Sequence, residues 1–470
     1  MKKIILLLFI SIPLFSQEYK KPPEVISSMI EADPQPNLSF NNKGDYALVM
    51  VRDGYKPIED LAIEELRIAG TRIDLKRYTS SRMTYYKSFY LIDINSGENI
   101  NLDYPKDGKF SFFSWSPDET KIAYTNTTEA GVELWVVDLN TKKSKKLSEK
   151  YINDILISPF QWFNSGSSLL VSYRCNSDMP LIKSVPSGPI IQQTNNQNAP
   201  SRTYQDLIKN KNDEILFEYY SCVELHKVSI NGSDSKIVDR GMIKDYDISP
   251  GQDYLLVKKI KKPFSYLVPY YRFPYEVKTI NIDNNIENII ADIPIDEVRP
   301  IGFDATRVGI RSVSWRDDKA SELYWVEAND NGDPKVEVDG RDIVYTLESP
   351  FNGNKNELLR TNLRFSNIRW STGNYAFLTE RLWKNRNEVI SLVDLKARSI
   401  DKVLFDRQYD DIYSNPGTPV YKKNNFNRNI VDIKKNSVYM VGQGGSPEGY
   451  KPFLSVLDLK SLKNKILFRS

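Results

Sequence analysis

A degenerate strand–turn–strand unit recurs along the chain and constrains its fold more than any other feature. The clearest copy is Phe113–Tyr124, in which an aromatic anchor and a Ser-Pro-Asp turn precede a short apolar strand. Proline fixes φ and aspartate can hydrogen-bond to its own backbone, so this triplet predicts a tight turn. A further strand, Leu134–Leu139, ends in a polar turn, and both strands have the β-branched and aromatic residues typical of sheets.

Further copies of this unit are spread over the rest of the chain. They begin near Leu38, Phe160, Tyr246, Val313, Ile368 and, most weakly, Val431. The anchors Trp115 and Trp162 stand 47 residues apart. Trp315 and Trp370 stand 55 residues apart. These spacings are close to the repeat of a propeller blade, roughly 40–50 residues.

We therefore predict an all-β fold, a β-propeller of seven four-stranded blades with short helical insertions. A ring of six or eight blades also fits the spacing. Radial stacking buries both faces of each blade, and the tryptophans are expected to anchor the core between blades. Ring closure requires the first and last blades to meet, and we expect the strand over 45–52 to meet the strand over 453–459.

Three segments interrupt the blade pattern. Residues 59–70 have helical spacing with acidic residues in the first turn, which predicts a helix. Residues 176–212 are rich in Pro, Ser, Asn and Gln, and Ser201 or Thr203 could cap a short helix near their end. Residues 263–274 contain three prolines and five aromatic residues. Long ordered insertions on a rigid scaffold often carry function.

The N-terminus has the pattern of a secretory signal peptide. Lys2 and Lys3 precede an apolar run over 4–15, and cleavage after Ser16 is predicted. This assigns residues 1–16 to the signal peptide and 17–470 to the propeller domain. No other apolar run is long enough for a membrane span. The prediction is an exported protein, periplasmic or extracellular, and the net charge of +3 gives no indication of nucleic-acid binding.

Cys175 and Cys222 are the only cysteines, and they flank the long insertion. Export permits a disulfide between them. Two buried free thiols are the simpler expectation, because free cysteine behaves as a small apolar residue. The sequence leaves both alternatives open.

Residues suited to catalysis are scarce. The one histidine, His226, lies in an alternating strand, which favours a structural role. The nearest approach to a Gly-x-Ser-x-Gly elbow is 444–449, where Pro447 removes the N–H that an oxyanion hole needs, so a turn is predicted. Asn329–Asp333 resembles a calcium loop, but the twelfth position counted from Asp330 is Arg341, and a hairpin turn is favoured. We predict no catalytic residue, metal or cofactor.

The aromatic insertion is the best candidate for a binding surface. It could line a ligand or partner surface, although packing of a blade-to-blade crossover is favoured. The candidate residues for a partner or substrate surface are Arg202, Tyr204, Phe264, Tyr266, Tyr270, Tyr271 and Arg272.

With these insertions, the sequence resembles the N-terminal half of exported bacterial serine peptidases of the prolyl oligopeptidase family, on the branch that includes glutamyl endopeptidases. The resemblance is carried by the shared order of several short segments. These are 20–24, 65–70, 202–207, 217–220, 263–274, 301–305, 323–328 and 446–449.

The resemblance implies a propeller that covers the entrance to a C-terminal α/β-hydrolase domain carrying a Ser-Asp-His triad. This chain ends at Ser470, about where that domain would begin, and no residue matches the family's catalytic positions. The expected function is therefore a non-catalytic propeller that gates or binds peptide substrates and docks a hydrolase domain supplied separately. The alternative is a stand-alone exported scaffold that binds a peptide or protein ligand.

Overall fold

The computed structural model describes residues 20–175, 178–181 and 204–470. The predicted signal peptide lies outside the described residues, as do Arg202, Ser201, Thr203 and most of the insertion over 176–212.

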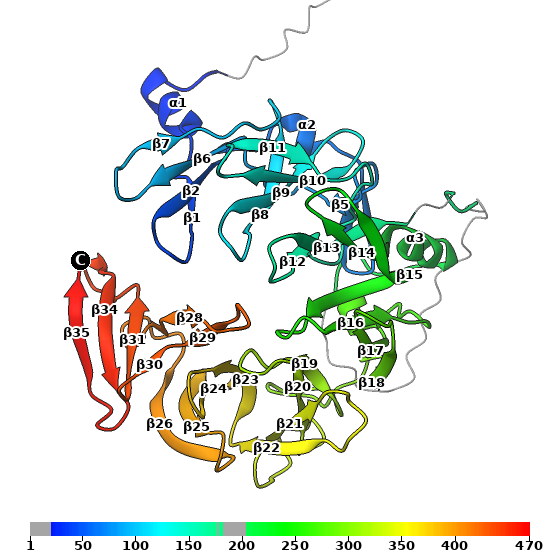
Figure 1. Ribbon diagram of the computed structural model, residues 1–470. Coiled ribbons are helices and arrows are strands. Elements are labelled where there is room, and N and C mark those ends of the chain that lie inside the picture. Colours follow the sequence, from blue (N-terminus) through cyan, green and yellow to red (C-terminus); the bar gives the residue numbers. More distant parts are fainter. Residues whose placement is uncertain (1–19, 176–177, 182–203) are drawn as a thin grey trace, which may run out of the picture.

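The chain forms seven antiparallel blades arranged around a common axis (Figure 1). Blade 1 contains β1 (Asn37–Phe40), β2 (Tyr46–Val51), β6 (Ser88–Asp93) and β7 (Asn99–Ile100). Blade 2 contains β8 (Lys109–Trp115), β9 (Lys121–Thr127), β10 (Val132–Asp138) and β11 (Lys143–Lys146). Blade 3 contains β12 (Phe160–Trp162), β13 (Ser168–Arg174), β14 (Cys222–Ser229) and the first half of β15 (Asp234–Ile248).

The remaining blades continue the same plan, and the long strand β15 serves two of them. Blade 4 contains the second half of β15, then β16 (Tyr254–Ile260), β17 (Tyr275–Asn281) and β18 (Glu287–Ile293). Blade 5 contains β19 (Arg311–Trp315), β20 (Glu322–Ala328), β21 (Asp342–Glu348) and β22 (Asn356–Thr361). Blade 6 contains β23 (Arg364–Trp370), β24 (Tyr375–Leu382), β25 (Asn387–Asp394) and β26 (Ser399–Gln408). Blade 7 contains β27 (Thr418–Pro419), β30 (Ile433–Lys434), β31 (Ser437–Gly442), β34 (Phe453–Asp458) and β35 (Asn464–Arg469). The predicted seven-bladed propeller is confirmed.

Small elements decorate the connections between these strands. They are the helices α1 (Glu24–Glu31), α2 (Ile58–Leu61), α3 (Lys211–Ser221) and the 3-10 turn η1 (Tyr270–Arg272), the three-stranded sheet β3 (Glu65–Ile68), β4 (Thr71–Asp74) and β5 (Thr79–Ser80), and the hairpins β28 (Tyr421–Lys423) with β29 (Asn429–Val431) and β32 (Gly445–Ser446) with β33 (Gly449–Tyr450).

Tryptophans link successive blades through their indole N–H groups. Trp115 donates to Ser39 Oγ at 3.1 Å, which joins blade 2 to blade 1. Trp162 donates to the Ser114 carbonyl at 3.2 Å, and Trp315 donates to the Asp247 carbonyl at 2.9 Å. Because each ring packs apolar surface while its N–H finds an acceptor, both parts of the side chain are satisfied. Their predicted role as anchors between blades is confirmed.

The Ser-Pro-Asp turn is held by its own side chains, as predicted. The Ser116 hydroxyl donates to Asp118 Oδ1 at 2.5 Å and accepts from the Lys121 N–H at 2.9 Å. Ser249 accepts from the Tyr254 N–H at 3.0 Å at the equivalent place in blade 4. These local bonds fix the connection between the first and second strand of a blade.

Ring closure differs from the prediction. β2 pairs with β1 and β6, whereas β34 pairs with β31 and β35, so the two expected strands do not pair with each other. The physical reason is that residues 418–469 supply a complete set of strands to blade 7, which leaves no place for an N-terminal strand. Within the described chain, clusters of buried apolar residues join blades 1 to 2 through 6 to 7, but none joins blade 7 to blade 1.

The helix predicted over residues 59–70 was wrong. Residues 59–70 form only the short α2, and Glu65–Ile68 is a strand paired with β4. Burial of Ile68 and Ile73 on one side of this hairpin outweighs the helical spacing. A helix that was not predicted, α3, begins after Asn210, whose side chain accepts from the Asp213 N–H at 3.0 Å; the caps predicted at Ser201 or Thr203 lie outside the described residues.

The antiparallel order sorts the connections onto two faces. The connection between the second and third strands lies at the same end of a blade as the crossover to the next blade. We call this end the insertion face, because it carries the connections over 52–87, 204–221, 261–274 and 294–310. The opposite end, which carries the turns between first and second strands, is the turn face.

Blade packing gives a direct stability test. Leu457 in β34 is fully buried between blades 6 and 7, while Leu467 in β35 is 47% exposed. Leu457→Ala is expected to lower the free energy of unfolding by about 2–5 kcal/mol, because it leaves a cavity. Leu467→Ala, the control, should change it by less than about 1 kcal/mol. Urea denaturation measures both, and equal effects would contradict this account of the last blade.

Candidate functional site: the insertion face

Connections from three blades pack into one apolar cluster on the insertion face. It joins the β3–β4 hairpin of blade 1, the segment of blade 3 that ends in α3, and residues 263–274 of blade 4. Its buried members are Ile68, Ala69, Ile73, Ile155, Ile208, Phe217, Tyr220, Met242, Ile260, Phe264, Val268 and Phe273. Segments about 200 residues apart in the sequence therefore form one structure.

Backbone hydrogen bonds lock the three connections together at the β3–β4 turn. The Gly70 N–H donates to the Asp206 carbonyl at 2.8 Å, and the Tyr270 N–H donates to the Ala69 carbonyl at 2.7 Å. Gly70 has φ +79°, and a Cβ there would lie 2.3 Å from Pro269 Cβ. Only glycine fits this close approach without displacing the backbone.

Arg272 is the polar centre of the same structure. Its guanidinium donates to both oxygens of Asp296, at 3.1 and 3.2 Å, and to the Tyr204 hydroxyl at 2.5 Å. Burial would raise the pKa of Asp296, but the Arg299 and Arg272 guanidiniums hold that pKa below its usual range. A buried charge with this many partners fixes the geometry of the segment.

The predicted surface residues divide into two groups. Phe264 and Arg272 are each only 6% exposed and hold the cluster together, so they form no surface; Tyr270 packs against them. Tyr266 and Tyr271 are exposed, and the Tyr266 hydroxyl donates to Glu214 at 2.6 Å. Packing, the favoured alternative, thus accounts for most of the aromatic insertion.

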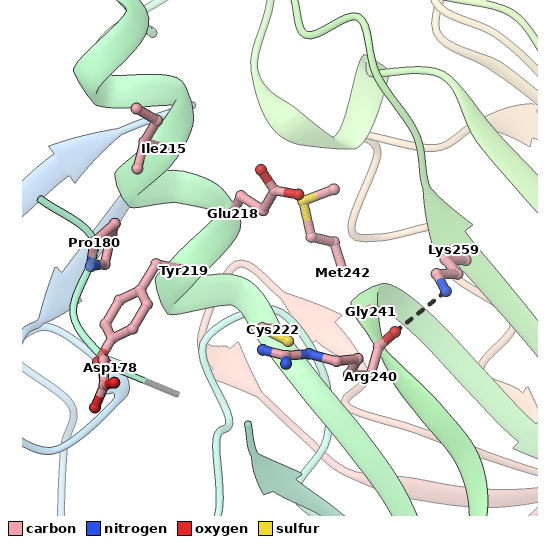
Figure 2. A pocket seen from close by; sticks show the side chains of 10 residues that line it. All are labelled: Asp178, Pro180, Ile215, Glu218, Tyr219, Cys222, Arg240, Gly241, Met242 and Lys259. Carbon is pink, nitrogen blue, oxygen red and sulfur yellow. Dashed lines mark hydrogen bonds between the residues drawn. The ribbon is translucent and has the colours of Figure 1, made fainter. Parts of the chain in front are cut away.

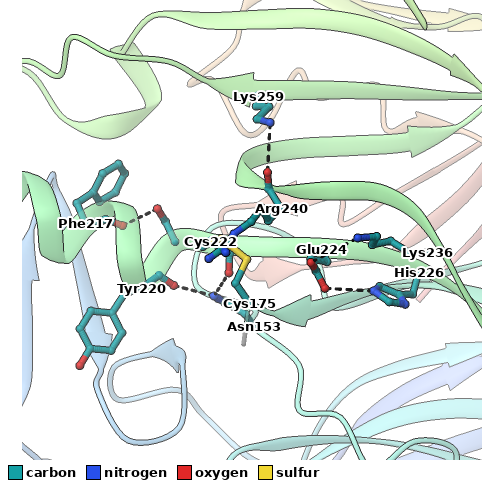
Figure 3. Close-up of a disulfide and its surroundings, with 11 residues drawn as sticks. Asn153, Cys175, Phe217, Tyr220, Cys222, Glu224, His226, Lys236, Arg240 and Lys259 are labelled. Carbon is teal, nitrogen blue, oxygen red and sulfur yellow. Dashed lines mark hydrogen bonds and ion pairs between the residues drawn. A yellow bond between two sulfur atoms is a disulfide. The ribbon is translucent and has the colours of Figure 1, made fainter. Parts of the chain in front are cut away.

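Cys175 and Cys222 form a disulfide across the base of the blade 3 insertion (Figure 3). Of the two alternatives left open by the sequence, the structure has the bonded one. Beside it, Asn153 Nδ2 donates to the carbonyls of Tyr220 at 2.7 Å and Cys222 at 3.1 Å. The end of α3 is therefore tied to the connection between blades 2 and 3.

A cavity of about 510 Å³ lies beside this disulfide, between α3 and the middle of β15 (Figure 2). Its charged residues balance, with Asp178 and Glu218 against Arg240 and Lys259. The remaining lining residues are Pro180, Ile215, Tyr219, Cys222, Gly241 and Met242. The cavity offers apolar walls and two charges of each sign, and its lining does not place a nucleophile beside a base.

Two further cavities open on the insertion face. One of about 500 Å³, by blades 1 and 2, includes Lys56 and Lys109. The other, of about 330 Å³ by blades 5 and 6, includes Arg381, Trp383 and Tyr409. Both cavities combine cations and aromatic rings with carboxylates, which are Asp53, Asp60 and Asp107 in the first and Asp304 in the second.

The residues with side chains suited to catalysis have structural partners. His226 is buried, with Nδ1 2.6 Å from Asp234 Oδ1. Ser446 donates to the Gly449 carbonyl at 2.7 Å within a turn, as predicted. Asp330 pairs with Arg364 at 2.7 Å. The described residues contain no group of three or more His, Cys, Asp or Glu side chains placed to hold a metal ion.

One feature of this face was missed by the sequence analysis. The helix α1 buries none of its residues and exposes Val25, Ile26, Met29 and Ile30. Their spacing after two prolines is a helix pattern that could have been recognised. Because β1 begins at the insertion face, α1 precedes it on that side. None of the helices among the described residues is long and apolar enough to cross a bilayer.

The chain is similar in sequence to two plant proteins. No family model matches the chain. A probable glutamyl endopeptidase of Oryza sativa is 33% identical over 96% of this chain and 51% of its own length. Its counterpart from Arabidopsis thaliana is 32% identical over 96% of this chain and 49% of its own length; both are named chloroplastic. The chain is similar to one half of these plant proteins. It spans about half the length of the curated relatives it matches, in agreement with the resemblance described above.

Solved structures include distant matches to the same fold. A prolyl endopeptidase is matched with a TM-score of 0.46 and 12% identity, over 94% of this chain and 50% of the other. An acylaminoacyl peptidase of Pyrococcus horikoshii is matched with a TM-score of 0.42 and 11% identity, over 94% of this chain and 53% of the other. At these TM-scores the likeness supports no functional statement.

Asp154, beneath the blade 1 insertion, gives a pH test of the insertion face. Burial raises its pKa to about 7, and one carboxylate oxygen has no hydrogen-bond partner. Since the folded state binds this proton more tightly than the unfolded state, Asp154 lowers stability as pH rises from about 4 to about 7. Asp154→Asn should therefore be more stable than the wild type at pH 8, by on the order of 2–4 kcal/mol, and the gain should largely vanish near pH 4.

Thermal or urea unfolding at pH 4, 6 and 8 measures this difference. Asp253→Asn, at an exposed turn residue, serves as the control and should show little change. A gain for Asp154→Asn that is independent of pH would contradict the assignment of a buried ionising group.

Proposed function

We propose that this chain is the propeller half of a glutamyl endopeptidase-like serine peptidase. It binds and admits peptide substrates, and an α/β-hydrolase half supplied separately performs the hydrolysis. One observation carries the proposal: the similarity to the plant relatives runs through 96% of this chain but covers only 51% and 49% of theirs. In the family that the sequence resembles, the other half is the catalytic domain.

The insertion face is the proposed docking side for that half. The last strand, β35, runs toward this face, at the outer edge of blade 7. The exposed apolar residues of α1 are on the same side and have no partner among the described residues. Apolar patches of this kind mark interaction surfaces. The cavities on this face would then lie between the two halves, where peptides would be held.

The chain alone is expected to be inactive. Purified protein should neither hydrolyse a Glu-containing fluorogenic peptide nor react with a serine-directed fluorophosphonate probe. The C-terminal half of the rice relative, added in trans or fused after Ser470, should restore both signals. Turnover with serine labelling by this chain alone would overturn the non-catalytic assignment, and failure of either hydrolase form to associate would favour the stand-alone binding protein.

Charging the exposed face of α1 tests the docking surface. Val25 and Met29 are 72% and 75% exposed and lie one helical turn apart. The double variant Val25→Glu, Met29→Glu should weaken association with the hydrolase half at least about tenfold, since it places charges in an apolar contact. Ser28→Glu, on the polar side of the helix, should bind as the wild type does. Association is measured by calorimetry, and equal affinities for all three proteins would exclude α1 from the interface.

We also propose that the chain is exported to the periplasm or beyond. The proposal rests on the signal-peptide pattern in residues 1–16 and on the need of a disulfide for an oxidising compartment. N-terminal sequencing of protein from a bacterial periplasmic extract should begin at Gln17. An intact Met1 on protein retained in the cytoplasm would contradict export.

A further inference from the structure

The innermost strand of blade 7 is interrupted by a hairpin that leaves the blade. β27 and β30 both pair with β31, and the chain between them forms the β28–β29 hairpin. Figure 1 shows this hairpin pointing from blade 7 toward the middle of the ring. The two ends of the excursion stay together, because the Asp432 N–H donates to the Val420 carbonyl at 3.2 Å.

The tip of the hairpin contacts three blades on the far side of the ring. Asn164 of blade 3 donates to the Phe426 carbonyl at 2.9 Å, across 262 residues of sequence. Arg428 donates to Asp247 of blade 4 at 2.9 Å and also bonds the Ile248 carbonyl. Asn424 donates to the Asp317 carbonyl of blade 5 at 2.7 Å.

These contacts place the hairpin across the turn face. Asn164 and Asp317 both follow the innermost strand of their blades, in the turns that define that face. The base of the hairpin is held at the same level by the Thr372 N–H, which donates to the Val431 carbonyl at 3.1 Å. Since innermost strands line the central channel of a propeller, a hairpin that joins blade 7 to blades 3, 4 and 5 crosses that channel.

Asn424 both closes the turn at the tip of the hairpin and bonds blade 5. Asn424 Oδ1 accepts from the N–H groups of Phe426 and Arg428, each at 3.0 Å, which closes the turn while its amide nitrogen bonds blade 5. Asp317 is half-buried at this contact, and burial raises its pKa to about 6.

We propose that the β28–β29 hairpin closes the turn-face end of the central channel, so that a peptide can reach the channel only from the insertion face. Closure itself rests on the contacts above. The consequence for peptides rests on the proposed function, because only a peptidase half would use the channel as a route.

Thiol labelling tests closure without any activity. A cysteine in place of Asp317 lies under the tip, whereas one in place of Asp253 occupies the exposed equivalent turn of blade 4. With the native disulfide intact, a 5 kDa maleimide reagent should label the Asp317→Cys protein at least about tenfold more slowly than the Asp253→Cys protein. Equal rates would overturn the closure.

Removing the hairpin should abolish this protection. Replacing residues 421–431 by Gly-Ser-Gly joins two ends that are already hydrogen-bonded. In this background Asp317→Cys should label as fast as Asp253→Cys. If the shortened protein does not fold, Asn424→Ala with Arg428→Gln removes the contacts to blades 4 and 5 instead, and the same acceleration is expected. Protection that persists in a folded variant would overturn the proposal.

Peptide turnover with the hydrolase half tests whether peptides reach the channel only from the insertion face. Short Glu-containing peptides should be cleaved equally by the intact and shortened proteins, while a disulfide-knotted peptide of about 30 residues should be cleaved severalfold faster by the shortened one. Equal cleavage of the large peptide by the two proteins would overturn the proposal that the hairpin blocks entry from the turn face. If no protein cleaves even the short peptide, the proposed function fails, and the labelling rates alone decide whether the channel is closed.

Discussion

Burial of apolar surface between neighbouring blades is the interaction on which the rest of the structure depends. Each four-stranded sheet has two apolar faces, and the clusters around Val136, Leu255 and Leu378 show both faces covered by adjacent blades. The tryptophan N–H bonds from one blade to the preceding one fix the angle at which these faces meet. Because this packing holds the blades in place, the connections between strands can differ in length, and they differ between the two faces.

The insertion face gathers long connections into a structure of its own, and the turn face keeps short ones and a single crossing hairpin. Gly70, Asp206 and Tyr270 come from three blades and meet through main-chain hydrogen bonds, so the face has a defined shape before any partner arrives. Such preorganisation favours binding, because less conformational freedom is lost on association. Under the proposed function, the exposed apolar side of α1 is the place where a second protein half attaches on this side.

The parts of this structure that depend on local pattern could be predicted from the sequence, and those that depend on distant partners could not. Ser116-Pro117-Asp118 and the alternating strands predict a blade, because the hydrogen bonds of the turn join residues only a few positions apart. The segment Glu65–Ile68 has helical spacing but is a strand, because its buried side faces residues about 200 positions away. Arg272 was expected at a surface, and only Asp296 and Tyr204 reveal that it is internal. The hairpin over 421–431 carries no local sign of its contacts, which lie 107 to 262 residues away.

The β28–β29 hairpin also helps to hold blade 7 in the ring. Among the described residues, no strand pair and no apolar cluster joins blade 7 to blade 1, and its apolar packing is against blade 6. The bonds from Asn424, Phe426 and Arg428 attach it also to blades 3, 4 and 5, straight across the ring. A brace across the diameter resists outward movement of blade 7 more effectively than a contact at its edge. The same segment therefore limits both how the ring can open and what can pass through it, and a peptide route on the insertion face is the one that leaves this brace in place.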